Sequence, residues 1–224
     1  MNKIPIYFFP GMSSNSLIFE NIKLDSSLFD ITYLEWLPIN KQESLDDYVQ
    51  RFIPLIKHKN PILIGVSFGG IIAQEISKNI PVRKTIIISS IRCNKEYPKL
   101  YKFAKRTKLY KLLPTKYIDF IFNLFCKINK KAKERIPLYD KYLPIRDKEY
   151  LDWSIDKILN WKQCDSLKNV IHIHGDKDEL FPIKNINNAI VIKGGTHAMI
   201  IIKYKWFNNN LQNLILEENN EKND

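Results

Sequence analysis

Short runs of apolar, β-branched residues alternate with amphipathic stretches along most of the chain. Such runs predict buried strands, and stretches whose apolar positions recur every three to four residues predict helices. Strands that alternate with helices are typical of a doubly wound, mostly parallel α/β sheet, which is the fold class that we expect. The predicted strands are residues 4–9, 30–36, 61–65, 84–90, 169–174 and 189–192, and the predicted helices are residues 16–23, 44–58, 69–78 and 199–216.

One long segment interrupts this alternation. Residues 92–163 are rich in polar and aromatic side chains with helical periodicity, which prolines break at positions 98, 114, 137 and 144. We therefore divide the chain into an α/β core of residues 1–91 and 164–216 and a helical insertion of residues 92–163. The polar residues 217–224 are expected to be disordered, because they have no apolar side chains to bury.

A serine flanked by glycines follows the third predicted strand, in the segment Gly65-Val66-Ser67-Phe68-Gly69. This is the G-x-S-x-G pattern of a nucleophile elbow, a strained turn between a strand and a helix that exposes the serine hydroxyl. Such a turn leaves no room for a Cβ two residues to either side of the serine. The serine also lies at a helix N-terminus, where free N–H groups favour negative charge. We interpret Ser67 as a nucleophile; the alternative is an ordinary turn with an idle serine.

A serine hydroxyl needs a base that takes its proton, and the base needs a group that orients it. His197 is the preferred base, because it follows a Gly-Gly turn at the end of a predicted strand. The other three histidines have simpler interpretations. His172 lies inside an alternating strand as a packed core residue, His174 ends that strand and supports a turn, and His58 ends a lysine-flanked helix at the surface.

The orienting acid is sought in the turn after the fifth predicted strand. Asp178 is preferred to Asp176, because Asp176 lies closer to the strand end and can hydrogen-bond its own turn. Glu179 is a weaker third candidate. Ligands of parallel α/β sheets bind beyond the carboxyl ends of the strands. The preferred nucleophile, acid and base each follow a predicted strand, so we expect them at one site.

The order of serine, aspartate and histidine along the chain is that of the α/β-hydrolase superfamily, which the chain resembles over nearly its whole length. The resemblance rests on three segments, which are residues 65–70 (GVSFGG), 174–182 (HGDKDELFP) and 194–198 (GGTHA). In similar hydrolases the second aspartate of the middle segment is the acid of the catalytic triad, which favours Asp178. The resemblance thus implies the α/β-hydrolase fold and a triad of Ser67, Asp178 and His197.

The resemblance further implies an oxyanion hole made of two backbone N–H groups, those of Met12 and Phe68. Met12 follows the first predicted strand, at a turn where many relatives carry His-Gly and this chain has Pro10-Gly11. The residues Phe9-Pro10-Gly11 look more like the corresponding turn of thioesterase-type members. The predicted sheet also lacks the first antiparallel strands of larger members.

Nearly all of the net charge of +11 lies in residues 99–135, where twelve lysines and arginines face only Asp119 and Glu134. In similar hydrolases an insertion at this place forms a helical lid over the active site. The simplest interpretation is a lid with an apolar underside and solvated lysines. The alternative is a docking surface for an acidic carrier protein that bears a thioester-linked acyl chain, or for an anionic membrane surface. Nucleic acid is not expected, because no motif for binding it is visible.

The three cysteines are far apart and have neither disulfide nor metal-ligand spacing. Prolines interrupt the apolar start of the chain, which therefore does not resemble a signal peptide, and we expect a cytoplasmic protein. The chain also lacks a phosphate-binding glycine pattern and a metal-ligand cluster, so neither a cofactor nor a metal is expected.

We therefore expect a serine hydrolase that cleaves a carboxylic ester or thioester through an acyl-enzyme. Trp153 and Met199 are expected to contact the substrate. Three alternatives stay open. The first is a thioesterase that its basic lid directs to an acyl-carrier protein. The second is a catalytically idle binding module or membrane-surface protein on the same fold. The third is an enzyme that cleaves C–C bonds with the same three residues.

Overall fold

The computed structural model describes residues 3–117 and 136–217. Within these ranges six strands form one sheet in the order β2-β1-β3-β4-β5-β6, and every neighbouring pair is parallel. The predicted α/β class with a parallel sheet and a helical insertion is confirmed. The strands are β1 (Ile4–Phe9), β2 (Phe29–Tyr33), β3 (Ile62–Val66), β4 (Lys84–Ile88), β5 (Val170–Gly175) and β6 (Ile190–Ile192).

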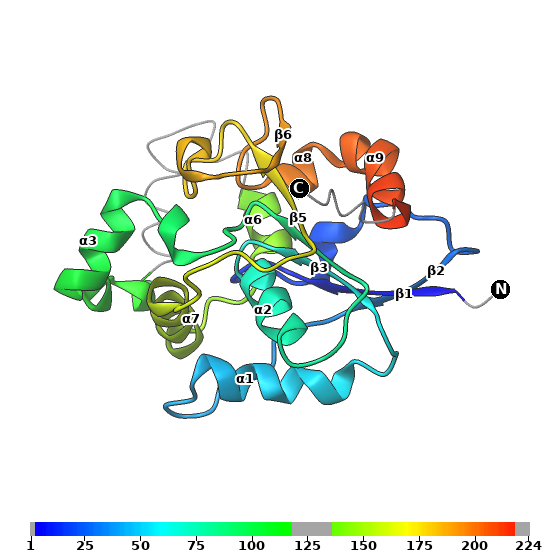
Figure 1. The fold of residues 1–224 in the computed structure, drawn as a ribbon. Coiled ribbons are helices and arrows are strands. Elements are labelled where there is room, and N and C mark those ends of the chain that lie inside the picture. Colours follow the sequence, from blue (N-terminus) through cyan, green and yellow to red (C-terminus); the bar gives the residue numbers. More distant parts are fainter. Residues whose placement is uncertain (1–2, 118–135, 218–224) are drawn as a thin grey trace.

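Helices cover both faces of the sheet (Figure 1). On one face lie α1 (Leu45–Phe52) and α2 (Phe68–Ser77), and on the other lie α8 (Met199–Ile202) and α9 (Tyr204–Leu216). Successive side chains of a strand point to opposite faces. In β1, for example, the odd-numbered aromatic residues pack with α1 and α2, whereas the even-numbered residues pack with α9. The central strands β1 and β3 are therefore apolar along nearly their whole length, as strands buried on both faces are.

The insertion between β4 and β5 lies beyond the carboxyl ends of the strands, on the side toward which β1 runs in Figure 1. Its described helices are α3 (Lys99–Thr107), α6 (Ile136–Tyr142) and α7 (Lys148–Asn160). Short 3₁₀ turns cover Asn94–Glu96, Leu109–Leu112 and Thr115–Tyr117. The insertion is thus placed above the sheet edge to which the predicted reactive turns belong.

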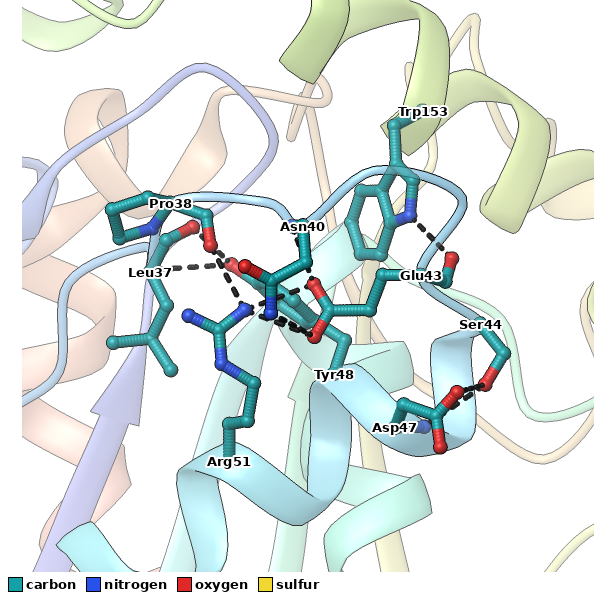
Figure 2. Close-up of polar contacts among 9 residues, drawn as sticks. All are labelled: Leu37, Pro38, Asn40, Glu43, Ser44, Asp47, Tyr48, Arg51 and Trp153. Atoms are coloured by element: carbon teal, nitrogen blue, oxygen red, sulfur yellow. Dashed lines mark hydrogen bonds and ion pairs between the residues drawn. The ribbon is translucent and has the colours of Figure 1, made fainter.

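A polar network fastens α7 to the core beside α1 (Figure 2). The indole N–H of Trp153 donates to the backbone carbonyl of Glu43 over 2.8 Å. The carboxylate of Glu43, whose side chain is 3% exposed, accepts from Arg51 at 2.9 Å and from the backbone N–H of Asn40 at 2.9 Å. A buried charge is tolerated when it is paired and hydrogen-bonded in this way. The network therefore joins the insertion to the segment that leads into α1.

Two predicted helices are shorter than the sequence indicated. Within residues 16–23 only Ser16–Phe19 is helical, as a 3₁₀ turn. The backbone groups that follow bind Asn208 of α9 instead of continuing the helix. Asn208 accepts from the N–H of Lys23 at 2.8 Å and donates to the carbonyl of Asn21 at 3.0 Å. The helix predicted for residues 44–58 ends at Phe52 and continues as a 3₁₀ turn that contains Pro54, which has no N–H to donate.

The predicted C-terminal helix is broken at Lys203, whose ψ of 23° leaves the helical region. Both helices turn an apolar face toward the sheet, with Met199 and Ile200 from α8 and Phe207 and Leu211 from α9.

Among the described residues, no helix is both long and apolar enough to cross a lipid bilayer. The cytoplasmic location stays a prediction. Residues 118–135 of the predicted basic lid, and all of the predicted disordered tail except Glu217, lie outside the described residues.

Candidate active site

Ser67 lies between β3 and α2 in a strained turn, with φ 52° and ψ −117°. A non-glycine residue takes such a conformation only where its surroundings hold it there. Here its N–H donates to the carbonyl of Ile88 at 2.8 Å, and its carbonyl accepts from the hydroxyl of Ser90 at 2.7 Å. A Cβ at Gly65 would lie 2.2 Å from the carbonyl oxygen of Gly69. The glycines therefore let strand and helix approach closely enough to form the turn.

Three side chains from distant turns meet at the carboxyl ends of the strands. His197 Nε2 lies 2.9 Å from Ser67 Oγ, and His197 Nδ1 lies 2.9 Å from Asp178 Oδ2. Asp178 is buried, while the side chain of His197 is 25% exposed. An ionised carboxylate only accepts hydrogen bonds, so it favours the tautomer of His197 that carries its proton on Nδ1. Nε2 is then left to accept the proton of the serine hydroxyl.

The turn after β5 holds Asp178 in place through its backbone. The other carboxylate oxygen, Oδ1, accepts from the N–H groups of Leu180 and Phe181, each at 2.9 Å. Asp176 points elsewhere, because it accepts from the N–H of Gly194 at 2.6 Å and so joins the turn after β5 to the turn after β6. Glu179 lies exposed on the surface. Of the three acids considered from the sequence, Asp178 is the one that contacts His197.

Two buried histidines lie behind this acid. His174 Nε2 lies 2.7 Å from the carbonyl of Phe181 and 3.6 Å from Asp178 Oδ2, and His174 Nδ1 lies 3.1 Å from His172 Nε2. Burial lowers the pKa of His174, and burial followed by the charge of His174 lowers the pKa of His172 well below its usual value. Both rings are therefore neutral at pH 7. His174 supports the turn that carries the acid.

The fourth histidine, His58, does not belong to the hydrogen-bonded row of Ser67, His197 and Asp178. Its side chain is 43% exposed, and its ring nitrogens lie 2.8 Å from the hydroxyl of Tyr7 and 3.3 Å from a carboxylate oxygen of Asp30. It is a surface residue, as the sequence indicated.

The two amides proposed for the oxyanion hole belong to neighbouring turns. Phe68 is the first residue of α2, and Met12 follows β1. A Cβ at Gly69 would lie 2.3 Å from the carbonyl oxygen of Pro10, which shows how closely the two turns approach. Within the described part of the chain, neither of these two N–H groups donates a hydrogen bond to another protein group.

A cavity of about 710 Å³ opens onto Ser67 and His197. Its walls are almost entirely apolar and come mainly from the insertion. They include Leu100, Tyr101, Leu109, Leu113, Ile155 and Ile158, while Met12 and Phe181 belong to the core. Burial and the charge of Asp178 raise the pKa of Tyr101, so its phenol stays protonated. A cavity of this size and character accepts an extended apolar group.

Comparisons with known proteins find the same architecture in solved structures. No family model and no curated sequence matches the chain. A hydrolase from Pseudomonas aeruginosa PA01 matches with a TM-score of 0.70 at 10% identity, over 96% of this chain and 91% of that one. A thermophilic esterase from Thermogutta terrifontis matches with a TM-score of 0.64 at 11% identity, over 96% and 90%. A bromoperoxidase from Bacillus anthracis matches with a TM-score of 0.62 at 15% identity, over 96% and 93%. The chain has the α/β-hydrolase fold.

Two residues expected to contact the substrate lie elsewhere in this α/β-hydrolase fold, so that expectation was wrong. Trp153 is 8% exposed and points toward α1, where Glu43 binds its indole N–H. Met199 is fully buried on the opposite face of the sheet, among the side chains that α8 and α9 turn inward. Neither residue lines the cavity. Trp161 is also buried, and its indole N–H donates to Glu75 at 2.5 Å.

The sequence missed most of the residues that surround the reacting groups of this α/β-hydrolase fold. Phe181 lies in a recognised segment, but its ring contact with His197, 5.6 Å between centroids, depends on how the acid turn folds. Ser90, whose hydroxyl donates to the carbonyl of Ser67, lies two residues beyond β4, the strand that neighbours β3. Only knowledge of the strand order could have pointed to it.

Described residues show no group of three or more histidine, cysteine, aspartate or glutamate side chains that could hold a metal ion.

Proposed function

We propose that this protein is a serine hydrolase that cleaves carboxylic esters or thioesters of apolar acyl groups through an acyl-enzyme on Ser67. The hydrogen-bonded row of serine, histidine and aspartate at the mouth of an apolar cavity carries the proposal. The α/β-hydrolase fold supports it, since solved structures of similar fold include proteins described as esterases.

Each residue of the row has one part in the reaction. His197 Nε2 takes the proton of Ser67 as Oγ attacks the carbonyl carbon, and Asp178 stabilises the imidazolium that forms. The N–H groups of Met12 and Phe68 bind the oxyanion. His197 then returns the proton to the leaving alcohol or thiol. A water molecule, deprotonated by the same Nε2, attacks the acyl-enzyme, and collapse of the second tetrahedral intermediate releases the acid and restores the serine.

The oxyanion donors matter because they bind charge that appears only in the transition state. In a protease where one such donor was removed, the loss of transition-state stabilisation was roughly 3–4 kcal/mol. A donor must be available when this charge develops, and the amides of Met12 and Phe68 bind no other described group. Their availability supports acyl transfer as the reaction class.

The cavity supports the acyl side of the substrate. Its apolar walls begin at the serine and histidine and continue along the insertion, and the described residues place no buried cation beside the reacting atoms to bind a second anionic group. Arg146, which also lines the cavity, donates to the carbonyl of Leu143 at 2.6 Å and to the carboxylate of Asp140 at 2.8 Å. We therefore propose an unbranched or aromatic acyl chain as the group bound there.

The test combines a covalent probe with one substitution. A fluorophosphonate should label the wild-type protein and not Ser67→Ala, and the variant should lose hydrolysis of p-nitrophenyl butyrate while its thermal unfolding midpoint stays near that of the wild type. Ser77→Ala is a matched control that removes a serine hydroxyl from the other end of α2 and should still be labelled. Labelling or turnover by Ser67→Ala at the wild-type rate would refute the assignment. An unlabelled wild-type protein would favour the idle binding module.

A further inference from the structure

The cavity opens beside a strongly basic surface that we call the basic rim, residues 99–117. The rim comprises α3 and the two 3₁₀ turns that follow it, and in Figure 1 α3 stands at the far side of the molecule from the N-terminus. The rim has no acidic residue, and all of its cationic side chains are exposed. These are Lys99, Lys102, Lys105, Arg106, Lys108, Lys111 and Lys116.

The same surface exposes large apolar side chains between its cations. Leu112 is 77% exposed and Leu100 is 70% exposed, and α3 has no buried residue at all. An exposed apolar patch of this kind indicates a surface that binds something other than water. The patch is continuous with the cavity, because Leu100, Phe103, Leu109, Leu113 and Leu180 are exposed and also line it.

The rim is held in this arrangement by α7. The hydroxyl of Tyr110 donates to Asp156 at 2.7 Å, and the hydroxyl of Thr115 donates to Asp152 at 2.6 Å. These two acidic side chains of α7 therefore fix the turns of the rim to the insertion. The cations and apolar side chains of the outer surface are presented together, without a rearrangement of the described residues.

We propose that the basic rim docks on an anionic lipid surface, with its cations at the phosphate groups and Leu100 and Leu112 in the acyl region. Amphipathic surfaces that combine lysines with exposed leucine and phenylalanine bind lipid interfaces in this way. An acidic protein surface would pair with the cations but would offer no apolar contact to the exposed leucines. Docking at the mouth of the cavity lets an acyl chain pass from the bilayer to Ser67. This last step rests on the proposed hydrolase function, whereas docking rests on the rim alone.

Binding is measured by sedimentation with vesicles of phosphatidylcholine and with vesicles that contain one third phosphatidylglycerol. We expect binding to the anionic vesicles that weakens as salt rises, and little binding to the neutral ones. Together the substitutions Lys99→Gln, Lys105→Gln and Lys111→Gln should lower the partition coefficient about 100-fold, at roughly fivefold for each cation.

A matched control removes the same number of positive charges at the amino ends of the strands, the end of the sheet opposite the insertion. Lys3, Lys57 and Lys59 are exposed and precede β1 and β3. Replacing these three by glutamine should change the partition coefficient less than about threefold, because they lie at the amino ends of β1 and β3, away from the rim, and salt screens distant charges. Equal losses in the two triple variants would mean that net charge alone drives binding, and would overturn the proposal.

A second pair of variants tests the apolar contribution. Leu112→Ser removes an exposed side chain of the rim that does not line the cavity, and Leu55→Ser removes one that is 38% exposed near the other edge. The first should weaken binding to anionic vesicles severalfold and leave hydrolysis of a soluble short ester unchanged. The second should change neither. Equal binding by Leu112→Ser and the wild type would refute insertion into the bilayer.

Two further measurements separate the explanations. If a small acidic acyl-carrier protein binds the rim, and anionic vesicles do not bind even at low salt, the surface is a protein-docking site and the lipid proposal is wrong. Ser67→Ala should bind vesicles as the wild type does. A wild-type protein that binds vesicles but hydrolyses no ester would refute the proposed hydrolase and leave the docking surface intact.

Discussion

The substitution Gly69→Ala tests how the site is built, because Gly69 lies where α2 meets the turn after β1. The added Cβ would lie 2.3 Å from the carbonyl oxygen of Pro10 and 2.5 Å from that of Phe9. Both obstructing atoms belong to the backbone and cannot rotate away. Real Cβ atoms essentially never approach closer than 3.0 Å, so the two segments must part by roughly 0.7 Å.

The expected loss of stability follows from two opposing contributions. Overpacking costs about 3 kcal/mol at the upper end of its usual range, which applies because backbone has to move. The higher helix propensity of alanine returns about 1 kcal/mol. The net loss of about 2 kcal/mol lowers the unfolding midpoint by roughly 4–8 °C for a domain of this size.

The same displacement should impair catalysis, because the amides of Met12 and Phe68 lie on the two segments that Gly69→Ala pushes apart. A misplacement of about 1 Å costs up to about 100-fold in rate. We expect kcat for a p-nitrophenyl ester to fall about 10- to 100-fold, with a smaller change in KM because most of the cavity wall belongs to the insertion. Thermal unfolding and steady-state hydrolysis measure the two effects.

The control for stability is Gly11→Ala, which adds the same methyl group to the turn after β1. Its nearest neighbour would be the hydroxyl of Ser14 at 3.2 Å, which can rotate, and the next is Ser67 Cβ at 3.5 Å. Its unfolding midpoint should stay within about 2 °C of the wild type. The reasoning is refuted if Gly69→Ala unfolds and turns over like the wild type, or if both variants lose the same stability.

Three further predictions concern the acid, the buried histidines and the cavity. Asp178→Asn should lower kcat about 10⁴-fold, because an asparagine does not hold the productive tautomer of the histidine, whereas Asp176→Asn should cost about tenfold or less; equal losses in ester hydrolysis would contradict the choice of acid. The free energy of unfolding should fall as pH drops below about 6.5, by up to about 1.4 kcal/mol per pH unit for each of His172 and His174. The reason is that burial lowers the pKa of both histidines in the folded protein, so the unfolded chain binds protons that the folded protein does not. In urea unfolding between pH 7 and pH 5, His172→Gln should therefore show a shallower pH dependence than the wild type, and an identical slope would rule this cause out. Ile155→Trp narrows the cavity, so kcat/KM for a dodecanoyl ester should fall about tenfold relative to a butanoyl ester, and an unchanged ratio would place the acyl chain elsewhere.

The reactive turns could be recognised from the sequence because their chemistry is written in neighbouring residues. Gly65 and Gly69 are needed within the same few residues as Ser67, and the acid turn contains both of its candidate aspartates. The alternation of strands and helices is likewise local, so it indicated the α/β class. Helix ends were less predictable, since Pro54 was visible but the bonds from Asn208 that end the first helical turn come from the other end of the chain.

Contacts between distant segments were decided by the folded chain alone. Local pattern marks Trp153 and Met199 as apolar, but it does not say whether such a side chain faces a cavity or the core, because that depends on how α7 and α8 are rotated against their neighbours. The 2.9 Å contacts of His197 with Ser67 and Asp178 depend in the same way on the strand order, which brings the turn of Ser67 to the turns of Asp178 and His197, more than a hundred residues later in the chain. Local sequence specifies which groups are available, and long-range packing determines which of them meet.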